Sequence, residues 1–105
     1  MNKKYYVLHL LPCRPDFSYT MTEEEREVMT RHVTYWKELM NRGQVLAFGP
    51  VVDPRGTYGL GIIMAENEEE VKMFIENDPA SELNSYEYFL MHAIVSATLA
   101  QHFNA

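Results

Sequence analysis

The sequence predicts an α+β fold in which a four-stranded antiparallel sheet carries two helices on one face. The chain of 105 residues has the size of one domain, and 47% of its residues are hydrophobic, which is enough for a core. Segments with strand and helix patterns follow one another in the order strand, helix, strand, strand, helix, strand. With right-handed crossovers this order predicts the ferredoxin-like βαββαβ topology, in a single domain spanning residues 1–105 with a core of about 4–95.

The first strand and the first helix have clear boundary signals. Lys4–Leu11 is rich in aromatic and β-branched residues and ends before Pro12, which predicts a strand. Thr22 followed three residues later by Glu25 forms a capping box, which predicts a helix that runs to about Arg42. Along this helix, large side chains and one histidine recur at steps of three and four, at Met29, His32, Trp36, Leu39 and Met40. We expect this stripe to face the sheet.

The second and third strands are predicted on either side of a turn. The short apolar segment Gln44–Phe48 predicts a strand that ends at Gly49-Pro50, and turn residues then lead to a strand over Thr57–Ala65. Gly59 and Gly61 leave one face of this third strand without side chains. We expect another group to lie against these glycines.

The second helix and the last strand complete the pattern. Asn67 and Glu70 form a weaker capping pair that opens a helix, and Pro79 ends it. Tyr86–Val95 is predicted as the last strand, and residues 96–105 as a short helix or a tail.

Composition and charge exclude several classes of protein. Fifteen acidic and nine basic residues give a formal net charge of −6, which is the wrong sign for a protein that neutralises nucleic-acid phosphates. No apolar run approaches the roughly 20 residues of a membrane-spanning helix, and the N-terminal segment does not resemble a signal peptide. The single cysteine, Cys13, cannot form an internal disulfide. We expect a cytoplasmic protein that binds neither nucleic acid nor membrane.

The first and last strands predict a second layer on the sheet. Both strands are apolar at both alternating positions, as in Tyr5 and Val7 against Tyr6 and Leu8, so both faces of the sheet should be covered. Two helices on one face cover only that face. The simplest cover for the other face is a second copy of the chain, which predicts an isologous homodimer.

His32 and Asp78 are the candidate catalytic pair. His32 places a titratable ring on the helix stripe that faces the sheet, and counting from Val71 places the Asp78 carboxylate on the corresponding face at the end of the second helix. If the two meet, Asp78 would fix the tautomer of His32 and leave the other ring nitrogen to move a substrate proton. In the structural alternative, His32 is a core histidine whose hydrogen bonds are satisfied, and Asp78 only ends a helix before Pro79.

Candidate substrate-binding residues lie near one end of the sheet. Arg14 and Phe17 follow the first strand, where a guanidinium beside an aromatic ring suits an anionic ring compound, although a solvated arginine is equally compatible with the pattern. Gly59 on the third strand is the third candidate. Cys13 is either a thiol activated by the neighbouring Arg14 or, as is commoner for a lone cysteine, a small packed residue.

No metal or cofactor site is predicted. The remaining histidines are scattered and form no metal-ligand spacing, at His9, His92 and His102. Gly59 and Gly61 lie inside a strand, so they do not form the glycine-rich loop before a helix that binds nucleotide phosphates.

Several motifs resemble those of the YciI-like (YCII-related) family over Tyr5 to Val95. They are Arg31–Trp36 (RHVTYW), Val45–Pro50 (VLAFGP), Asp53–Gly56 (DPRG) leading into Tyr58–Leu60 (YGL), Asn77–Ala80 (NDPA), and the opening segments Arg14–Phe17 (RPDF) and Met21–Glu25 (MTEEE). This resemblance implies a ferredoxin-like subunit, a dimeric α+β barrel with packed sheets, and a cleft that holds a His-Asp pair proposed as catalytic. His32 and Asp78 match that pair.

The sequence and the resemblance together predict a cofactor-independent homodimeric enzyme. We expect it to perform a lyase or isomerase step by proton transfer on a small metabolite, such as an aromatic or anionic one, with His32 as the acid/base and Asp78 as its orienting partner. The alternative is a non-catalytic homodimer that binds a small ligand or a partner in the same cleft. Replacing His32 with Asn separates the two, because a catalyst loses turnover and a binder keeps most of its affinity.

Overall fold

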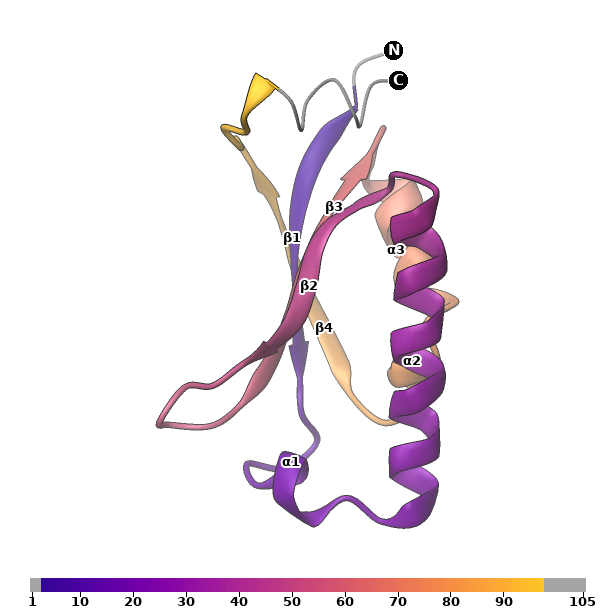
Figure 1. The fold of residues 1–105 in the computed structure, drawn as a ribbon, viewed down its shortest axis with the longest axis vertical. Coiled ribbons are helices and arrows are strands. Elements are labelled where there is room, and N and C mark those ends of the chain that lie inside the picture. Colours follow the sequence, from indigo (N-terminus) through magenta and orange to yellow (C-terminus); the bar gives the residue numbers. More distant parts are fainter. Residues whose placement is uncertain (1–2, 98–105) are drawn as a thin grey trace.

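The computed structural model describes residues 3–97 and has the ferredoxin-like fold expected from the sequence (Figure 1). All strand pairs are antiparallel, in the order β2-β3-β1-β4. The strands are β1 (Lys4–Leu11), β2 (Val45–Val51), β3 (Tyr58–Ala65) and β4 (Ser85–Met91). The helices are α1 (Phe17–Thr20), α2 (Glu23–Asn41) and α3 (Glu68–Glu76), with the short 3₁₀ helix η1 (Pro79–Glu82). Figure 1 shows α2 and α3 on one side of the sheet.

The capping signals of α2 are confirmed. The Thr22 side chain accepts a hydrogen bond from the Glu25 amide at 3.1 Å, and the Glu25 carboxylate accepts one from the Thr22 amide at 2.9 Å. After the helix, Gly43 has a φ of +78°, a conformation that glycine adopts more readily than other residues. The reciprocal cap and the glycine set the two ends of α2.

The predicted boundaries of β2 and β4 need correction. β2 does not stop at Gly49-Pro50 but continues to Val51, with Pro50 opposite Gly59 of β3. The prediction failed because β2 is an edge strand, where a proline without an N–H is tolerated. At the other edge, β4 ends at Met91 rather than at Val95.

Two short helices were not predicted. In α1 the Phe17 side chain is buried, and its amide donates to the Arg14 carbonyl at 3.1 Å, so the loop after β1 folds back on itself. η1 begins at Pro79, whereas α3 ends earlier than expected, at Glu76. Asp78 lies between the two helices in an extended conformation, as the following proline favours. The predicted C-terminal tail or helix lies outside the described residues from position 98 onward.

Trp36 is at the centre of the core between the helices and the sheet. It is 2% exposed, and its ring centroid lies 5.2 Å from that of Phe48 and 4.7 Å from that of Phe74. On the sheet side the ring crosses Gly61, where a Cβ atom would come within 2.2 Å of the indole. The expectation that another group lies against the β3 glycines is therefore confirmed for Gly61, and the group is Trp36.

Figure 1 shows α2 and α3 on one side of the sheet, and the opposite face of the sheet carries apolar side chains. Val7 of β1 pairs with Ile62 of β3 and with Phe89 of β4, so the three side chains share this face. Phe89 is 53% exposed. The predicted cover by a second copy of the chain stays a prediction at this point.

Candidate active site

His32 and Asp78 meet in the structure. His32 Nδ1 on α2 lies 2.9 Å from both carboxylate oxygens of Asp78. The Asp78 side chain has no exposed surface, and that of His32 is 11% exposed. Asp78 also accepts a hydrogen bond from the amide of Ala80 at 2.9 Å and thereby caps η1. The extended backbone before Pro79 thus turns the carboxylate toward α2.

The Asp78 carboxylate is the acceptor at the centre of a network. Within residues 3–97 four groups donate hydrogen bonds to it. Two are His32 Nδ1 and the Ala80 amide. The other two donate to Oδ2: the Trp36 indole N–H, at 2.7 Å, and the Tyr86 hydroxyl. Burial alone would raise the pKa of the Asp78 carboxyl, but the hydrogen bonds from His32 and Tyr86 outweigh burial and lower this pKa below its usual value. The carboxylate is therefore ionised at neutral pH.

Tyr86 remains a hydrogen-bond donor in this network. Burial, followed by the nearby charge of Asp78, raises the pKa of the Tyr86 hydroxyl well above its usual value. A second hydroxyl, that of Tyr35, donates to the Phe74 carbonyl at 2.7 Å, and burial raises the pKa of Tyr35 to about 12. Both phenols are protonated across the physiological range.

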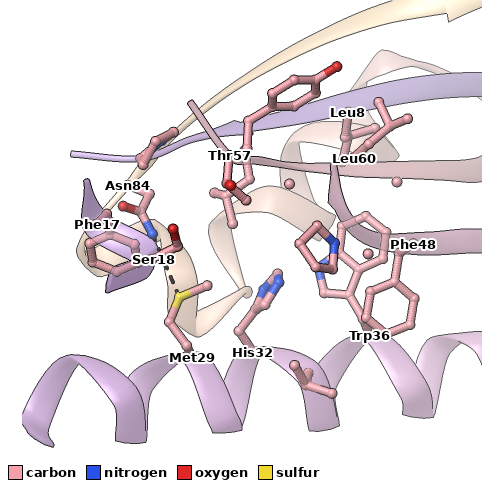
Figure 2. Close-up of a pocket in the computed structure, with 18 of the residues that line it drawn as sticks. Leu8, Phe17, Ser18, Met29, His32, Trp36, Phe48, Thr57, Leu60 and Asn84 are labelled. Atoms are coloured by element: carbon pink, nitrogen blue, oxygen red, sulfur yellow. Dashed lines mark hydrogen bonds between the residues drawn. The ribbon is translucent and has the colours of Figure 1, made fainter. Parts of the chain in front are cut away.

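The network determines which nitrogen of His32 carries the ring hydrogen. An ionised carboxylate only accepts hydrogen bonds, so His32 Nδ1 carries the hydrogen that it shares with Asp78. In the part of the chain that the structure describes, no hydrogen bond reaches Nε2, and His32 lines a pocket (Figure 2). Nε2 is therefore available to accept a proton.

The pocket is small and mostly apolar, with a volume of about 240 Å³. Pockets for drug-sized ligands usually have volumes of ~300–1,000 Å³, so this smaller pocket suits a compound about the size of one ring. In Figure 2 Trp36 and Phe48 lie on one side of His32, and Phe17, Ser18 and Asn84 on the other. The apolar lining comprises Leu8, Leu10, Pro12, Phe17, Met21, Met29, Val33, Trp36, Phe48, Gly49, Pro50, Gly59, Leu60 and Gly61, and the lining with polar groups comprises Ser18, His32, Thr57, Tyr58, Asn84 and Tyr86.

Among the predicted substrate-binding residues, Phe17 and Gly59 line this pocket and Arg14 does not. The Arg14 guanidinium binds both carboxylate oxygens of Glu25, at 2.8 and 3.0 Å, and donates to the Thr20 carbonyl at 2.7 Å. It lies 5.2 Å from the centre of the Phe17 ring. Arg14 lowers the pKa of Glu25 to about 2. Arg14 thus ties the loop around α1 to the start of α2 and is not part of the pocket lining.

Cys13 is exposed, so the expectation of a small packed residue is wrong. Its sulfur lies 3.7 Å from Arg14 Nη1, and its amide donates to the Asn84 side chain at 3.0 Å. The backbone of Cys13 therefore makes the part-buried contact to Asn84, and its thiol lies at the surface.

The sequence analysis missed three site residues. Trp36 was assigned to the core stripe alone, although its indole N–H was a signal that a buried acceptor must lie nearby. Tyr86 shares its strand face with Tyr88 at alternate positions, which could have placed its hydroxyl toward the helices. Asn84 precedes β4, and no local pattern marks it.

The described residues contain neither a cluster of metal ligands nor a helix that could span a membrane. Across residues 3–97, no group of three or more histidine, cysteine, aspartate or glutamate side chains could hold a metal ion. None of the helices in the same range is long and apolar enough to span a membrane.

Comparisons with solved structures and protein families show what the chain is similar to. The dehydrochlorinase TftG from Burkholderia phenoliruptrix AC1100, which acts on 5-chloro-2-hydroxyhydroquinone and was solved with 2,5-dihydroxybenzoquinone, is 20% identical, with a TM-score of 0.60 over 89% of this chain and 97% of that chain. The cofactor-independent oxygenase SnoaB from Streptomyces nogalater is 10% identical, with a TM-score of 0.48 over 92% and 98%. The protein YJCS is 16% identical, with a TM-score of 0.49 over 89% and 100%.

At such identities the likeness to TftG shows a shared fold. No curated protein matches the sequence. The family model of the YCII-related domain matches residues 6–91, which is most of the chain. The chain belongs to the YCII-related domain family.

Proposed function

We propose that the protein is a small-molecule enzyme that transfers a proton to or from a ring compound, with His32 as the general acid/base and Asp78 as the residue that orients it. The observation that carries the proposal concerns the two nitrogens of the His32 ring. Nδ1 is held by a buried carboxylate, whereas no hydrogen bond reaches Nε2 within residues 3–97, and His32 lines a mostly apolar pocket. Such a reaction is a lyase or isomerase step. No cofactor takes part in the proposed step.

The proposed chemistry uses the charge of Asp78. When His32 Nε2 takes a proton from the substrate, the ring becomes a cation, and the ionised carboxylate beside Nδ1 stabilises it. The mostly apolar walls exclude water, which strengthens this charge interaction. The same ring then returns the proton to another atom of the substrate, so no proton is gained or lost overall.

The test uses the replacement of His32 with Gln and a ring compound as probe. 2,5-Dihydroxybenzoquinone, the compound bound in the TftG structure, has ring hydrogens whose exchange for deuterium from D₂O can be followed by proton NMR. We expect the wild type to accelerate this exchange and His32→Gln to lose about 100-fold or more of the acceleration, since general acid/base catalysis supplies ~10²–10⁴-fold.

The matched control is His92→Gln, which removes an exposed histidine beyond β4. We expect its exchange rate to equal that of the wild type. If His32→Gln exchanges deuterium as fast as the wild type, the acid/base role of His32 is wrong.

The second candidate function is a non-catalytic module that binds a small ligand in the same pocket. The mostly apolar lining favours it, because such a lining provides affinity without any chemistry. In that case the wild type would bind 2,5-dihydroxybenzoquinone without accelerating exchange, and His32→Asn would keep most of the affinity.

A homodimer is part of the proposal. Its support is the sheet face opposite α2 and α3, where Val7, Ile62 and Phe89 lie next to one another and Phe89 is half exposed. The identical face of a second copy would bury this apolar patch symmetrically.

The dimer is tested by Phe89→Lys, which places a charge on the proposed interface. By analytical ultracentrifugation at micromolar concentration, we expect the wild type at twice the mass of one chain and Phe89→Lys at the mass of one chain. Met73→Lys is the control, because Met73 is 60% exposed on α3, which packs on the opposite side of the sheet. A monomeric wild type would contradict the dimer.

A further inference from the structure

The carboxamide of Asn84 has a defined orientation in the pocket wall. Asn84 lies between η1 and β4 and is 9% exposed. Its Oδ1 accepts a hydrogen bond from the backbone amide of Cys13 at 3.0 Å. Because a backbone N–H can only donate, this contact assigns the oxygen to the Cys13 side and turns the NH₂ group elsewhere.

The NH₂ group of Asn84 has no strong acceptor within residues 3–97. Its one hydrogen-bond contact there is the sulfur of Met29 at 3.7 Å, a weak acceptor (Figure 2). The hydroxyls of Ser18 and Thr57 line the same pocket and likewise make no side-chain hydrogen bond in the described part of the chain. A nearly buried amide N–H with only a sulfur partner is destabilising, and a ligand oxygen would relieve this deficit.

We propose that Asn84 Nδ2 donates a hydrogen bond to a carbonyl oxygen of the substrate, and that the substrates are small ring ketones with a hydrogen on the saturated carbon next to the carbonyl. This inference rests on the proposed proton transfer by His32. Asn84 and His32 line the same pocket, so a ring can present its carbonyl oxygen to one residue and a neighbouring C–H to the other.

The reaction step balances without any further reagent. The C–H bond next to the carbonyl breaks and its proton moves to His32 Nε2, while its electron pair forms a C=C bond and the carbonyl pair moves onto oxygen. The resulting enolate oxygen accepts the hydrogen bond from Asn84, which is stronger than the bond to the neutral ketone. Transfer of the proton from His32 to the enolate oxygen completes an isomerisation to the enol, whereas its return to the same carbon regenerates the ketone.

The test compares two ring probes of the same shape, cyclohexanone with a C=O group and methylenecyclohexane with C=CH₂. Affinities are measured by NMR titration of the indole signal of Trp36, the one tryptophan of the chain, which lies in the pocket wall. We expect the wild type to bind cyclohexanone about tenfold more tightly than methylenecyclohexane, which corresponds to the ~1.4 kcal/mol of one hydrogen bond. Equal binding of the two probes by the wild type overturns the inference.

The variant Asn84→Asp isolates the donor. It keeps an oxygen for the Cys13 amide and replaces the NH₂ group by a second oxygen, so we expect the preference for cyclohexanone over methylenecyclohexane to disappear. The control Asn67→Asp adds the same charge at the N-cap of α3, where Asp is also favourable, and should keep the preference. If Asn84→Asp keeps the preference, Asn84 is not the donor.

Two further readouts keep the inference separate from the proposed function. In the wild type, the Asn84 NH₂ signals should shift on addition of cyclohexanone but not of methylenecyclohexane, which tests the donor without any variant. Deuterium exchange next to the cyclohexanone carbonyl should stop in His32→Gln. If His32→Gln exchanges deuterium as fast as the wild type, the proposed proton transfer is wrong. If His32→Gln loses this exchange but Asn84→Asp still prefers cyclohexanone to methylenecyclohexane, only the role of Asn84 is wrong.

Discussion

Replacing Asp78 with Asn is expected to lower the free energy of unfolding at pH 7 by about 3 kcal/mol, the order found when one partner of a buried charged network is removed. Asn offers one accepting oxygen, whereas the carboxylate receives hydrogen bonds from four groups. Its NH₂ group would face donors, and the indole N–H of Trp36 cannot reverse its role. Urea unfolding of the two proteins measures the difference. Asp53→Asn is the control, because the side-chain oxygen of Asn can still accept the hydrogen bond that the Arg55 amide donates to Asp53 Oδ1.

The effect of Asp78→Asn should depend on pH in a defined direction. The pKa of Asp78 is lower in the folded protein than its usual value, so the unfolded chain binds the proton more tightly. The stability from the ionised carboxylate is therefore present above a pH of about 4 and is lost as the pH falls through the folded pKa. The difference between wild type and Asp78→Asn should narrow in that acidic window. A difference of less than about 0.5 kcal/mol at pH 7 would show that the network does not stabilise the fold.

Replacing Gly61 with Ala is expected to destabilise the protein by about 3 kcal/mol, at the upper end of the usual effect of overpacking a core. The new Cβ would lie 2.2 Å from two ring atoms of Trp36, and the ring is held between Phe48 and Phe74, so it cannot move away without repacking the core. Displacement of the indole would also break its hydrogen bond to Asp78.

Urea unfolding and the emission spectrum of Trp36 report the two effects of Gly61→Ala. We expect a red shift in emission, because the displaced indole meets water. Gly49→Ala is the matched control on the neighbouring strand, since a Cβ atom there would have no heavy atom within 4 Å. A Gly61→Ala protein with the stability and emission of the wild type would contradict this account of the core.

The elements that the sequence predicted well are those set by local signals. β1 has the predicted bounds, and α2 begins at the predicted capping box, because strand propensity and reciprocal caps act within a few residues. The end of β2 was wrong for a reason that is not local. Whether Gly49-Pro50 ends a strand depends on whether the strand lies at the edge of the sheet, and this follows only from the strand order.

His32 and Asp78 are in contact, as expected, but the local geometry from which this contact was predicted is only partly right. Asp78 was counted onto the face of the second helix, whereas α3 ends at Glu76 and Asp78 caps η1 instead. The carboxylate still points toward His32, because the extended residue before Pro79 turns the chain toward α2. Helical periodicity cannot describe a residue that lies between two helices.

The contact partners of Trp36 and Asn84 lie far from them in the sequence. Trp36 is 42 positions from Asp78, and the Asn84 side chain binds the amide of Cys13 71 positions away. Such contacts depend on how the helices cross the sheet and which strands pair, so no spacing in the sequence records them.

The measurement that tests the central claim most directly is the tautomer of the neutral His32 ring, read from ¹⁵N chemical shifts in long-range proton-nitrogen NMR correlations. We expect the hydrogen on Nδ1, with Nε2 bare, because Nδ1 is shared with the ionised carboxylate of Asp78. In Asp78→Asn this preference should weaken. A wild-type ring that carries its hydrogen on Nε2 would contradict the account, since Nε2 could then not accept a proton from a substrate.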